Sequence, residues 1–218
     1  MKKLFISKYR EELGLLPSFC NENHIELVAT PFIRFEPVTF SVDSDFEVVF
    51  FGSIRAASFF LLNQDIPKHV HLACVGETTA KKLRDKGYNV SFTGLKSGQP
   101  ELVANEFLKW LGSRRVLIPC SQQSKRTISK GIPSNQKEEK VVYQTLTDCR
   151  PLDDCDCYIF TSPSNVESFL SCNSKPEGKI IAWGTTTQKA MIESKLFADY
   201  TLEQSTEEEL IRLLKSEL

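Results

Sequence analysis

The sequence predicts an α/β protein of two similar parallel-sheet domains joined by a two-stranded hinge, with one domain discontinuous in the chain. Three observations support this prediction. Short motifs recur at a spacing of 108 or 109 residues, apolar runs alternate with amphipathic segments, and one N-terminal strand–helix–strand unit falls outside the repeat. Recurrence at a fixed spacing indicates duplicated units, and alternation of strands with helices indicates parallel sheets.

The repeat consists of three pairs of segments in the same order. Each pair combines a strand end with a small-residue turn or a helix start. The pairs are Phe51-Gly52-Ser53 with Phe160-Thr161-Ser162, Gly76–Thr79 with Gly184–Thr187, and Pro100-Glu101-Leu102 with Glu208-Glu209-Leu210. Three pairs at nearly one offset predict two related halves.

Five apolar runs in the first half are expected to be strands. They are residues 46–51, 71–75, 89–92, 115–118 and 140–143. Most are apolar almost throughout, which is typical of parallel strands that are covered by helices on both faces.

The intervening helices have recognisable ends. Ser53 is expected to cap the first helix, because a serine oxygen accepts from the free N–H groups there. Gly87 is expected to end a helix that begins near Glu77. Pro100 and Gly112 have the positions expected at the start and end of a third helix.

The N-terminal unit has no counterpart before the second copy. It comprises strands at residues 3–7 and 25–29 with a helix around 13–21. We expect it to join the C-terminal half, whose last helix is predicted to begin with a capping box of Ser205 and Glu208.

The chain would then cross between the domains twice, near residues 31–37 and 141–147. The expected boundaries are residues 1–33 plus 148–218 for the discontinuous domain, 38–142 for the other domain, and 34–37 and 143–147 for the linkers.

Composition excludes several classes of protein. The 27 basic and 28 acidic residues give a net charge of −1, which argues against a general nucleic-acid binder. No apolar run approaches the roughly 20 residues that span a membrane, and the N-terminus does not resemble a signal peptide. A cytoplasmic protein is expected.

The seven cysteines are expected to be free thiols in a reducing compartment. Cys155 with Cys157, and His69 with His71, are spaced as halves of a metal site, but neither pair has a second pair at zinc-site spacing. No metal and no cofactor are therefore predicted.

The repeated turns are the candidate ligand site. In open parallel sheets ligands bind beyond the carboxyl ends of the strands, and helix N-termini there attract anions. The turns are Gly52-Ser53, Gly76–Thr79, Thr161–Ser164 and Gly184–Thr187, and the basic residues Arg55, Lys125, Arg126 and Lys130 are further candidates. Helix capping and a solvated basic surface are the alternative explanations.

These motifs resemble the uroporphyrinogen-III synthase family over nearly the whole chain. The first half resembles it in Ser53-x-Arg55 after an apolar strand and in the segment from Val75 to Leu83. Val141–Thr145 is similar to the hinge strand of the family, in which Tyr143 would be the active-site tyrosine. The segments 160–166 and 184–187 are similar to the serine and threonine motifs of the second half.

Several positions depart from the family pattern. Ile6-Ser7-Lys8 stands where the family often has Thr-Arg-Pro, Gly52 and Ile54 stand where Thr and Pro are common, and Lys195 replaces a helix-ending glycine.

The resemblance implies a cofactor-free lyase of haem biosynthesis. Its substrate, hydroxymethylbilane, would be cyclised with inversion of the terminal pyrrole ring and loss of water. The implied catalytic residue is Tyr143. The implied substrate-binding residues are Ser53, Arg55, Gly76, Thr79, Ser162, Ser164, Gly184, Thr186 and Thr187.

A monomer with this small-molecule substrate is expected, without nucleic-acid or membrane partners. The alternatives are a non-catalytic two-lobed binding module for a small anionic ligand, and a regulatory domain that has lost the activity. Tyr143 at a predicted domain crossing favours the enzyme.

Overall fold

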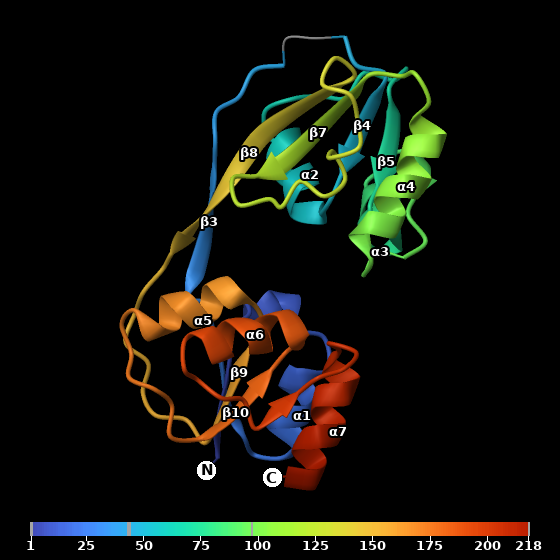
Figure 1. Ribbon diagram of the computed structural model, residues 1–218. Coiled ribbons are helices and arrows are strands. Elements are labelled where there is room, and N and C mark those ends of the chain that lie inside the picture. The colour runs from blue at the N-terminus through green and yellow to red at the C-terminus, as the bar shows by residue number, and fades with distance from the viewer. Residues whose placement is uncertain (1, 43–44, 97, 218) are drawn as a thin grey trace. The chain divides into compact units, whose positions relative to one another are not determined.

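The computed structural model describes residues 2–42, 45–96 and 98–217 (Figure 1). The chain divides into two compact units. Unit 1 combines the chain up to Arg34 with the chain from Leu146 onward, and unit 2 is formed by Phe35–Thr145. None of the helices described is long and apolar enough to cross a membrane.

Unit 2 is built on a six-stranded sheet in the order β3-β8-β7-β4-β5-β6. Its strands are β3 (Ile33–Pro37), β4 (Val48–Phe51), β5 (His71–Cys74), β6 (Val90–Thr93), β7 (Val116–Ser121) and β8 (Lys137–Thr147), and its helices are α2 (Ile54–Leu61), α3 (Glu77–Asp85) and α4 (Pro100–Leu111). The pairs from β8 through to β6 are parallel. Strands β3 and β8, which are neighbours at one edge of the sheet, carry the two chain crossings, because each extends across a unit boundary.

Unit 1 is built on a five-stranded parallel sheet in the order β11-β10-β9-β1-β2. Its strands are β1 (Lys3–Ile6), β2 (Glu26–Ala29), β9 (Cys157–Phe160), β10 (Lys179–Ala182) and β11 (Tyr200–Thr201). Its helices are α1 (Leu16–Glu22), α5 (Pro163–Leu170), α6 (Thr185–Glu193) and α7 (Glu207–Glu217), with a short 3-10 turn η1 (Arg10–Glu12).

The two sheets share one arrangement with a different chain order. Strands β9, β10 and β11 correspond to β4, β5 and β6, as the repeat predicts. On the other side of the central strand, unit 2 uses β7 and β8, which come later in the chain, whereas unit 1 uses β1 and β2, which come first. The predicted fold class is confirmed, and the N-terminal strand–helix–strand unit completes the sheet of the C-terminal half.

Each sheet is covered on both faces, as expected of parallel strands. In β4, Val49 and Phe51 face α2 and α3, whereas Val48 and Phe50 face α4. In unit 1, α1 and α7 cover one face, and α5 and α6 cover the other. Each fully buried Phe or Val contributes about 1.5–3 kcal/mol of transfer free energy. The cores on both faces therefore stabilise the packing of each sheet against its helices.

Both chain crossings are anchored on α5 where they meet unit 1. The N–H of Phe32, just before β3, donates to Asn165 Oδ1 at 2.7 Å, and its carbonyl accepts from Ser168 Oγ. The same carbonyl accepts from the N–H of Asp148, just after β8, at 2.8 Å. Two buried side chains of one helix therefore fix the entry and exit of the chain together.

A disulfide joins Cys149 to Cys172, next to this anchor. The expectation that all seven cysteines are free was therefore wrong for this pair, because the chain after β8 runs along the end of α5 and brings two distant cysteines together. The other five cysteines are buried thiols.

Most of the predicted helix ends are found. Ser53 Oγ accepts from Ala56 N at 3.1 Å. Gly87 and Gly112 follow α3 and α4 with φ of 88° and 61°, a backbone region that glycine occupies without strain. At α6, Lys195 has φ of 55°, so it adopts the left-handed conformation that glycine supplies in unit 2.

The predicted capping box of Ser205 and Glu208 was wrong by one residue. Thr206 Oγ1 accepts from Glu209 N at 3.2 Å, and the Glu209 carboxylate accepts from the N–H groups of Glu203 and Gln204. Ser205 instead has φ of 55°, a left-handed conformation that leaves Thr206 as the capping residue.

Glu207 of α7 is expected to stabilise unit 1 by capping α1. Its carboxylate accepts from the N–H groups of Gly14, Leu15 and Leu16 at 2.8–3.2 Å, and α1 has no capping side chain of its own. Because hydrogen bonds to charged groups contribute about 1.5–3 kcal/mol, Glu207→Ala should lower the free energy of unfolding by about 1–3 kcal/mol. Urea denaturation followed by Trp183 fluorescence in a Trp110→Phe background measures this.

The matched control is Glu208→Ala, which removes the same charge from the first turn of α7 at an exposed position. Equal destabilisation by the two variants would show that only the helix-end charge matters, and would contradict the capping role.

Candidate active site

A cavity lies in unit 2 at the ends of two central strands. Its volume is about 220 Å³. It lies where β4 and β7 end, and it is closed by residues 124–129 and by β8. Its lining includes Gly52, Ser53, Ser121, Arg126, Ser129, Glu139 and Tyr143, with Phe50, Ile118, Pro119 and Ile128 as apolar walls.

This position is the reversal point of the sheet. From β4 the chain proceeds through β5 and β6 on one side and then returns to β7 on the other side. The connections that leave β4 and β7 diverge, and a crevice at the carboxyl ends of the strands results. In unit 1 the corresponding pair is β9 with β1.

The two units differ in the hydrogen bonds that they make at this reversal point. In unit 1, Thr161 N donates to Ser7 Oγ, and Thr161 Oγ1 donates to the Ser7 carbonyl, both at 2.8 Å. The strand registers put Gly52 and Pro119 at the equivalent places in unit 2. Neither side chain can make these bonds, so the reversal point is tied by hydrogen bonds in unit 1 and holds a cavity in unit 2.

Ser53 and Tyr143 are brought together at this cavity. Ser53 contributes from the start of α2, where its Oγ also caps the helix. Tyr143 is 8% exposed. It stacks on Phe59 with ring centroids 5.1 Å apart, and it contacts Phe35 edge-on at 5.9 Å. The ring is therefore fixed by packing while the residue still lines the cavity.

Arg55 is not among the residues that line the cavity. Its guanidinium lies 3.7 Å from the centre of the Phe35 ring, a cation–π contact. Phe35 lies on β3, the first crossing strand, and also contacts the Tyr143 ring. Arg55 and Tyr143 therefore contact the same Phe35 ring.

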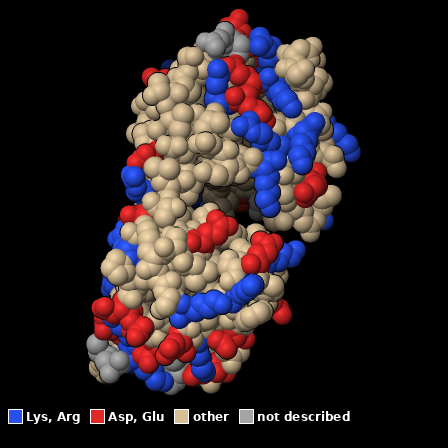
Figure 2. All heavy atoms as spheres, turned by 60° about the vertical axis from the view of Figure 1, so that its left-hand side comes forward, with Lys and Arg blue, Asp and Glu red and all other residues tan. Residues whose placement is uncertain are grey.

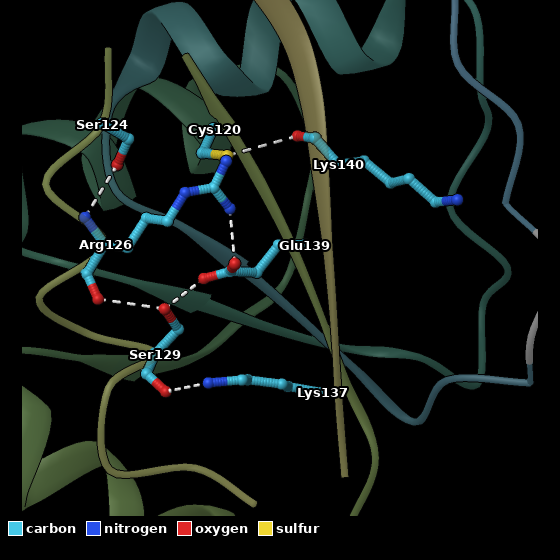
Figure 3. A network of polar contacts seen from close by, with 7 residues as sticks. All are labelled: Cys120, Ser124, Arg126, Ser129, Lys137, Glu139 and Lys140. Atoms are coloured by element: carbon cyan, nitrogen blue, oxygen red, sulfur yellow. Dashed lines mark hydrogen bonds and ion pairs between the residues drawn. The ribbon is translucent and has the colours of Figure 1, made fainter. Parts of the chain in front are cut away.

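An ion-pair network, by contrast, was missed by the sequence prediction. Arg126 Nη1 donates to one carboxylate oxygen of Glu139, and Ser129 Oγ contacts the other oxygen (Figure 3). The bond to Glu139 raises the pKa of the Arg126 side chain. Arg126 was considered only as part of a basic cluster, because the sequence does not show that residues 124–129 fold back over β8.

Gly76 and Thr79 lie at the N-terminus of α3, outside the residues lining the cavity. Gly76 is the N-cap residue, and no side chain caps this helix. Thr79 is 7% exposed and lies three positions further on. The idea that its hydroxyl caps the helix was therefore wrong, because the N-cap position belongs to a glycine.

The unit 1 residues follow the same plan. Ser162 caps α5 by accepting from Asn165 N at 3.3 Å, and it also accepts from Asn165 Nδ2 at 2.9 Å. Ser164 and Thr186 are exposed in the first turns of α5 and α6. Gly184 is the N-cap of α6, so Thr187, 3% exposed, does not cap it either.

Lys8 is a second residue that the prediction left out. It follows β1, and its Nζ lies 4.2 Å from the centre of the Trp183 indole ring at the end of β10. Burial lowers the pKa of Lys8, although the charges of Glu207 and Glu12 oppose this shift. A partly desolvated ammonium group therefore lies beside the N-terminus of α6.

The five free cysteines are buried thiols. Burial raises the pKa of Cys74 and Cys157 to about 12, and that of Cys20 and Cys155 to about 11. Cys155 and Cys157 pack in different hydrophobic clusters on opposite faces of the sheet. Among residues 2–42, 45–96 and 98–217, no three His, Cys, Asp or Glu side chains are grouped as metal ligands.

The fold and these strand ends define a two-unit α/β protein with polar, anion-compatible helix starts. A family model described as uroporphyrinogen-III synthase HemD matches residues 19–212. The chain belongs to the uroporphyrinogen-III synthase family, whose members are lyases of tetrapyrrole biosynthesis.

Solved structures share the fold of this chain. The chain is similar to a uroporphyrinogen-III synthetase from Helicobacter pylori, with a TM-score of 0.73 and 19% identity over 100% of both chains. It is also similar to a mutant uroporphyrinogen III synthase from Thermus thermophilus, with a TM-score of 0.58 and 12% identity over 99% and 97% of the two chains. No curated protein sequence matches the chain significantly.

Tyr143→Phe tests whether the hydroxyl of this residue takes part in the reaction. The change keeps the ring that stacks on Phe59. Because general-acid assistance is typically worth 10²–10⁴-fold in rate, kcat should fall by about that factor while the melting temperature stays constant. Stopped assays of type III product measure kcat. Near-normal turnover, equal to that of a Tyr88→Phe control in the same unit, would leave Tyr143 as a packing residue.

Thr79→Val and Thr187→Val test whether these buried hydroxyls bind the substrate. Valine keeps the shape and removes only the hydroxyl. If each hydroxyl donates to a substrate carboxylate, at about 1.5–3 kcal/mol, kcat/KM should fall by about 10–100-fold in each variant. The exposed neighbour in Thr78→Val is the control. Unchanged kcat/KM in folded variants would assign both threonines to the helix interior alone.

Proposed function

We propose that this protein cyclises hydroxymethylbilane to uroporphyrinogen III, with inversion of the terminal pyrrole ring. The observation that carries the proposal is the family match, which spans residues 19–212 and so covers both units. The cavity at the reversal point of unit 2 adds a place where a ring and its side chains fit.

The reaction needs two kinds of assistance. The hydroxymethyl carbon loses its hydroxyl as water, which requires a proton donor. The resulting electrophile is attacked by the terminal ring to give a spirocyclic intermediate, which opens and closes again with that ring inverted. Tyr143 is the proposed proton donor, since its hydroxyl is a hydrogen-bond donor on a ring that packing holds in place.

The substrate carries eight carboxylates, whereas the protein has a net charge of −1. Basic and acidic side chains are interspersed on the face shown in Figure 2. Binding must therefore depend on local fields rather than on overall charge. Ser53, Ser162, Ser164, Gly76, Gly184, Thr79, Thr186 and Thr187 at helix starts, with Arg55, are the proposed contacts.

The energetic scale is consistent with this proposal. A charge at a helix N-terminus contributes about 0.3–1 kcal/mol, and up to about 2 kcal/mol in a partly buried geometry. Four such helix starts contribute part of the roughly 8 kcal/mol of a micromolar complex. Arg55 can add a charge-assisted hydrogen bond to these contributions.

Holding the two ends of the substrate in a reactive orientation supplies further catalysis, because closure then starts from a conformation close to the transition state. We further propose that the enzyme works as a monomer in the cytoplasm, that residues 1–33 plus 148–218 and 38–142 are its functional domains, and that no cofactor takes part.

The purified protein should convert fresh hydroxymethylbilane largely to the type III isomer. Spontaneous closure gives type I, so chromatographic separation of the oxidised products distinguishes the enzyme from a passive binder. Only type I product in the presence of folded protein would contradict the proposed function and favour the non-catalytic module. Dialysis against EDTA serves as a control, and it should leave the type III yield unchanged.

A further inference from the structure

Hydrogen bonds fix both the backbone and the side chain of Arg126, which lines the cavity of unit 2. Its backbone has φ of 55°, which is uncommon for a residue with a long side chain. Ser124 Oγ accepts from its N–H at 3.2 Å, and its carbonyl accepts from Ser129 N at 3.1 Å. These bonds hold the left-handed conformation, and the guanidinium is thereby presented to the cavity that it lines.

Glu139 holds the guanidinium from the opposite side. It lies on β8, in register with Ile118 of β7, and its side chain is 21% exposed. Its two oxygens contact Arg126 and Ser129, and Lys137 Nζ donates to the Ser129 carbonyl at 2.6 Å (Figure 3). The carboxylate is therefore fixed at both oxygens before any ligand arrives.

The Arg126 guanidinium has more N–H donors than its bond to Glu139 uses. An arginine side chain has five N–H donors in a planar fork. Within the part of the chain that the structure describes, one of these, on Nη1, is committed to Glu139. A second carboxylate can therefore bind to the remaining donors without displacing Glu139.

The cavity around these donors is too small for a whole tetrapyrrole. Small-molecule pockets usually measure about 300–1,000 Å³, whereas this one measures about 220 Å³. Its apolar walls, Phe50, Ile118 and Ile128, suit one flat ring, and the hydroxyls of Ser53 and Ser121 add polar contacts.

We propose that this cavity binds one carboxylate-bearing pyrrole ring of the substrate, with Arg126 contacting the carboxylate and Glu139 acting as a positioning residue for the guanidinium. The identity of the ring's parent molecule rests on the proposed function, whereas the carboxylate site rests on the geometry of unit 2. Glu139 also lowers the affinity of the site, because its negative charge lies next to the incoming carboxylate.

The test is binding of a monopyrrole, porphobilinogen, which carries one acetate and one propionate, to the full chain. Its dissociation constant, measured by NMR titration, should rise at least tenfold in Arg126→Gln. Arg126→Lys should give an intermediate value, because an ammonium group is a point charge rather than a fork. The dimethyl ester of the same pyrrole should bind wild type and Arg126→Gln equally weakly.

Arg84→Gln is the matched control. Arg84 pairs with Glu77 at 2.7 Å in the same unit, outside the residues that line the cavity. Its dissociation constant for the monopyrrole should equal that of wild type, so a loss confined to Arg126 variants assigns the effect to the cavity.

Glu139→Gln keeps the proposal testable if Arg126→Gln does not fold. Glutamine retains an acceptor for Arg126 but removes the charge, so the monopyrrole should bind several-fold more tightly even though the ion pair is lost. Weaker or unchanged binding in Glu139→Gln, or wild-type binding in folded Arg126→Gln, would overturn the proposal.

The two proposals fail separately. If wild type yields only the type I isomer but binds the monopyrrole through Arg126, the proposed function fails and the carboxylate site remains. If wild type yields type III and the KM of Arg126→Gln is unchanged, the carboxylate site is wrong and the proposed function remains.

Discussion

Parallel pairing at the centre of each sheet, β4 with β7 and β9 with β1, is the constraint on which the rest of the structure depends. Parallel strands require crossover connections, and the connections leaving the two central strands run in opposite directions. The space between them is set by the residues just past the strand ends. In unit 1, Ser7 and Thr161 bond across it, whereas Gly52 and Pro119 in unit 2 make no such bonds. Two differences between the units therefore go with a closed reversal point in unit 1 and a cavity in unit 2.

Much of this could be predicted from the sequence, for local reasons. The spacing of the repeat is preserved in the chain, so the correspondence of β9 with β4 follows directly. Ser53 and Gly87 act within a single helix turn, and both were located correctly. The capping box failed at Ser205 because two neighbouring hydroxyl residues can each cap α7, and only the left-handed backbone of Ser205 decides between them.

What could not be predicted depends on contacts between distant segments. The disulfide of Cys149 with Cys172 forms because the chain after β8 packs on α5, which no spacing rule reveals. The pairing of Arg126 with Glu139 depends on a turn whose backbone conformation is held by serine hydroxyls. Similarly, Tyr143 was placed by resemblance, but its stacking on Phe59 follows only from the register of β8 beside β7.

The two units also differ in how they hold their cationic side chains at the strand ends. Lys8 lies against the Trp183 ring in unit 1, and Arg126 pairs with Glu139 in unit 2. The Lys8 ammonium group lies against an indole face and is partly desolvated, which lowers its pKa, although the charges of Glu207 and Glu12 oppose this shift. A guanidinium already paired with a carboxylate offers geometry instead of excess charge. The two units therefore hold these cations differently, one against an aromatic ring and one against a carboxylate, although they share one repeated arrangement of strands.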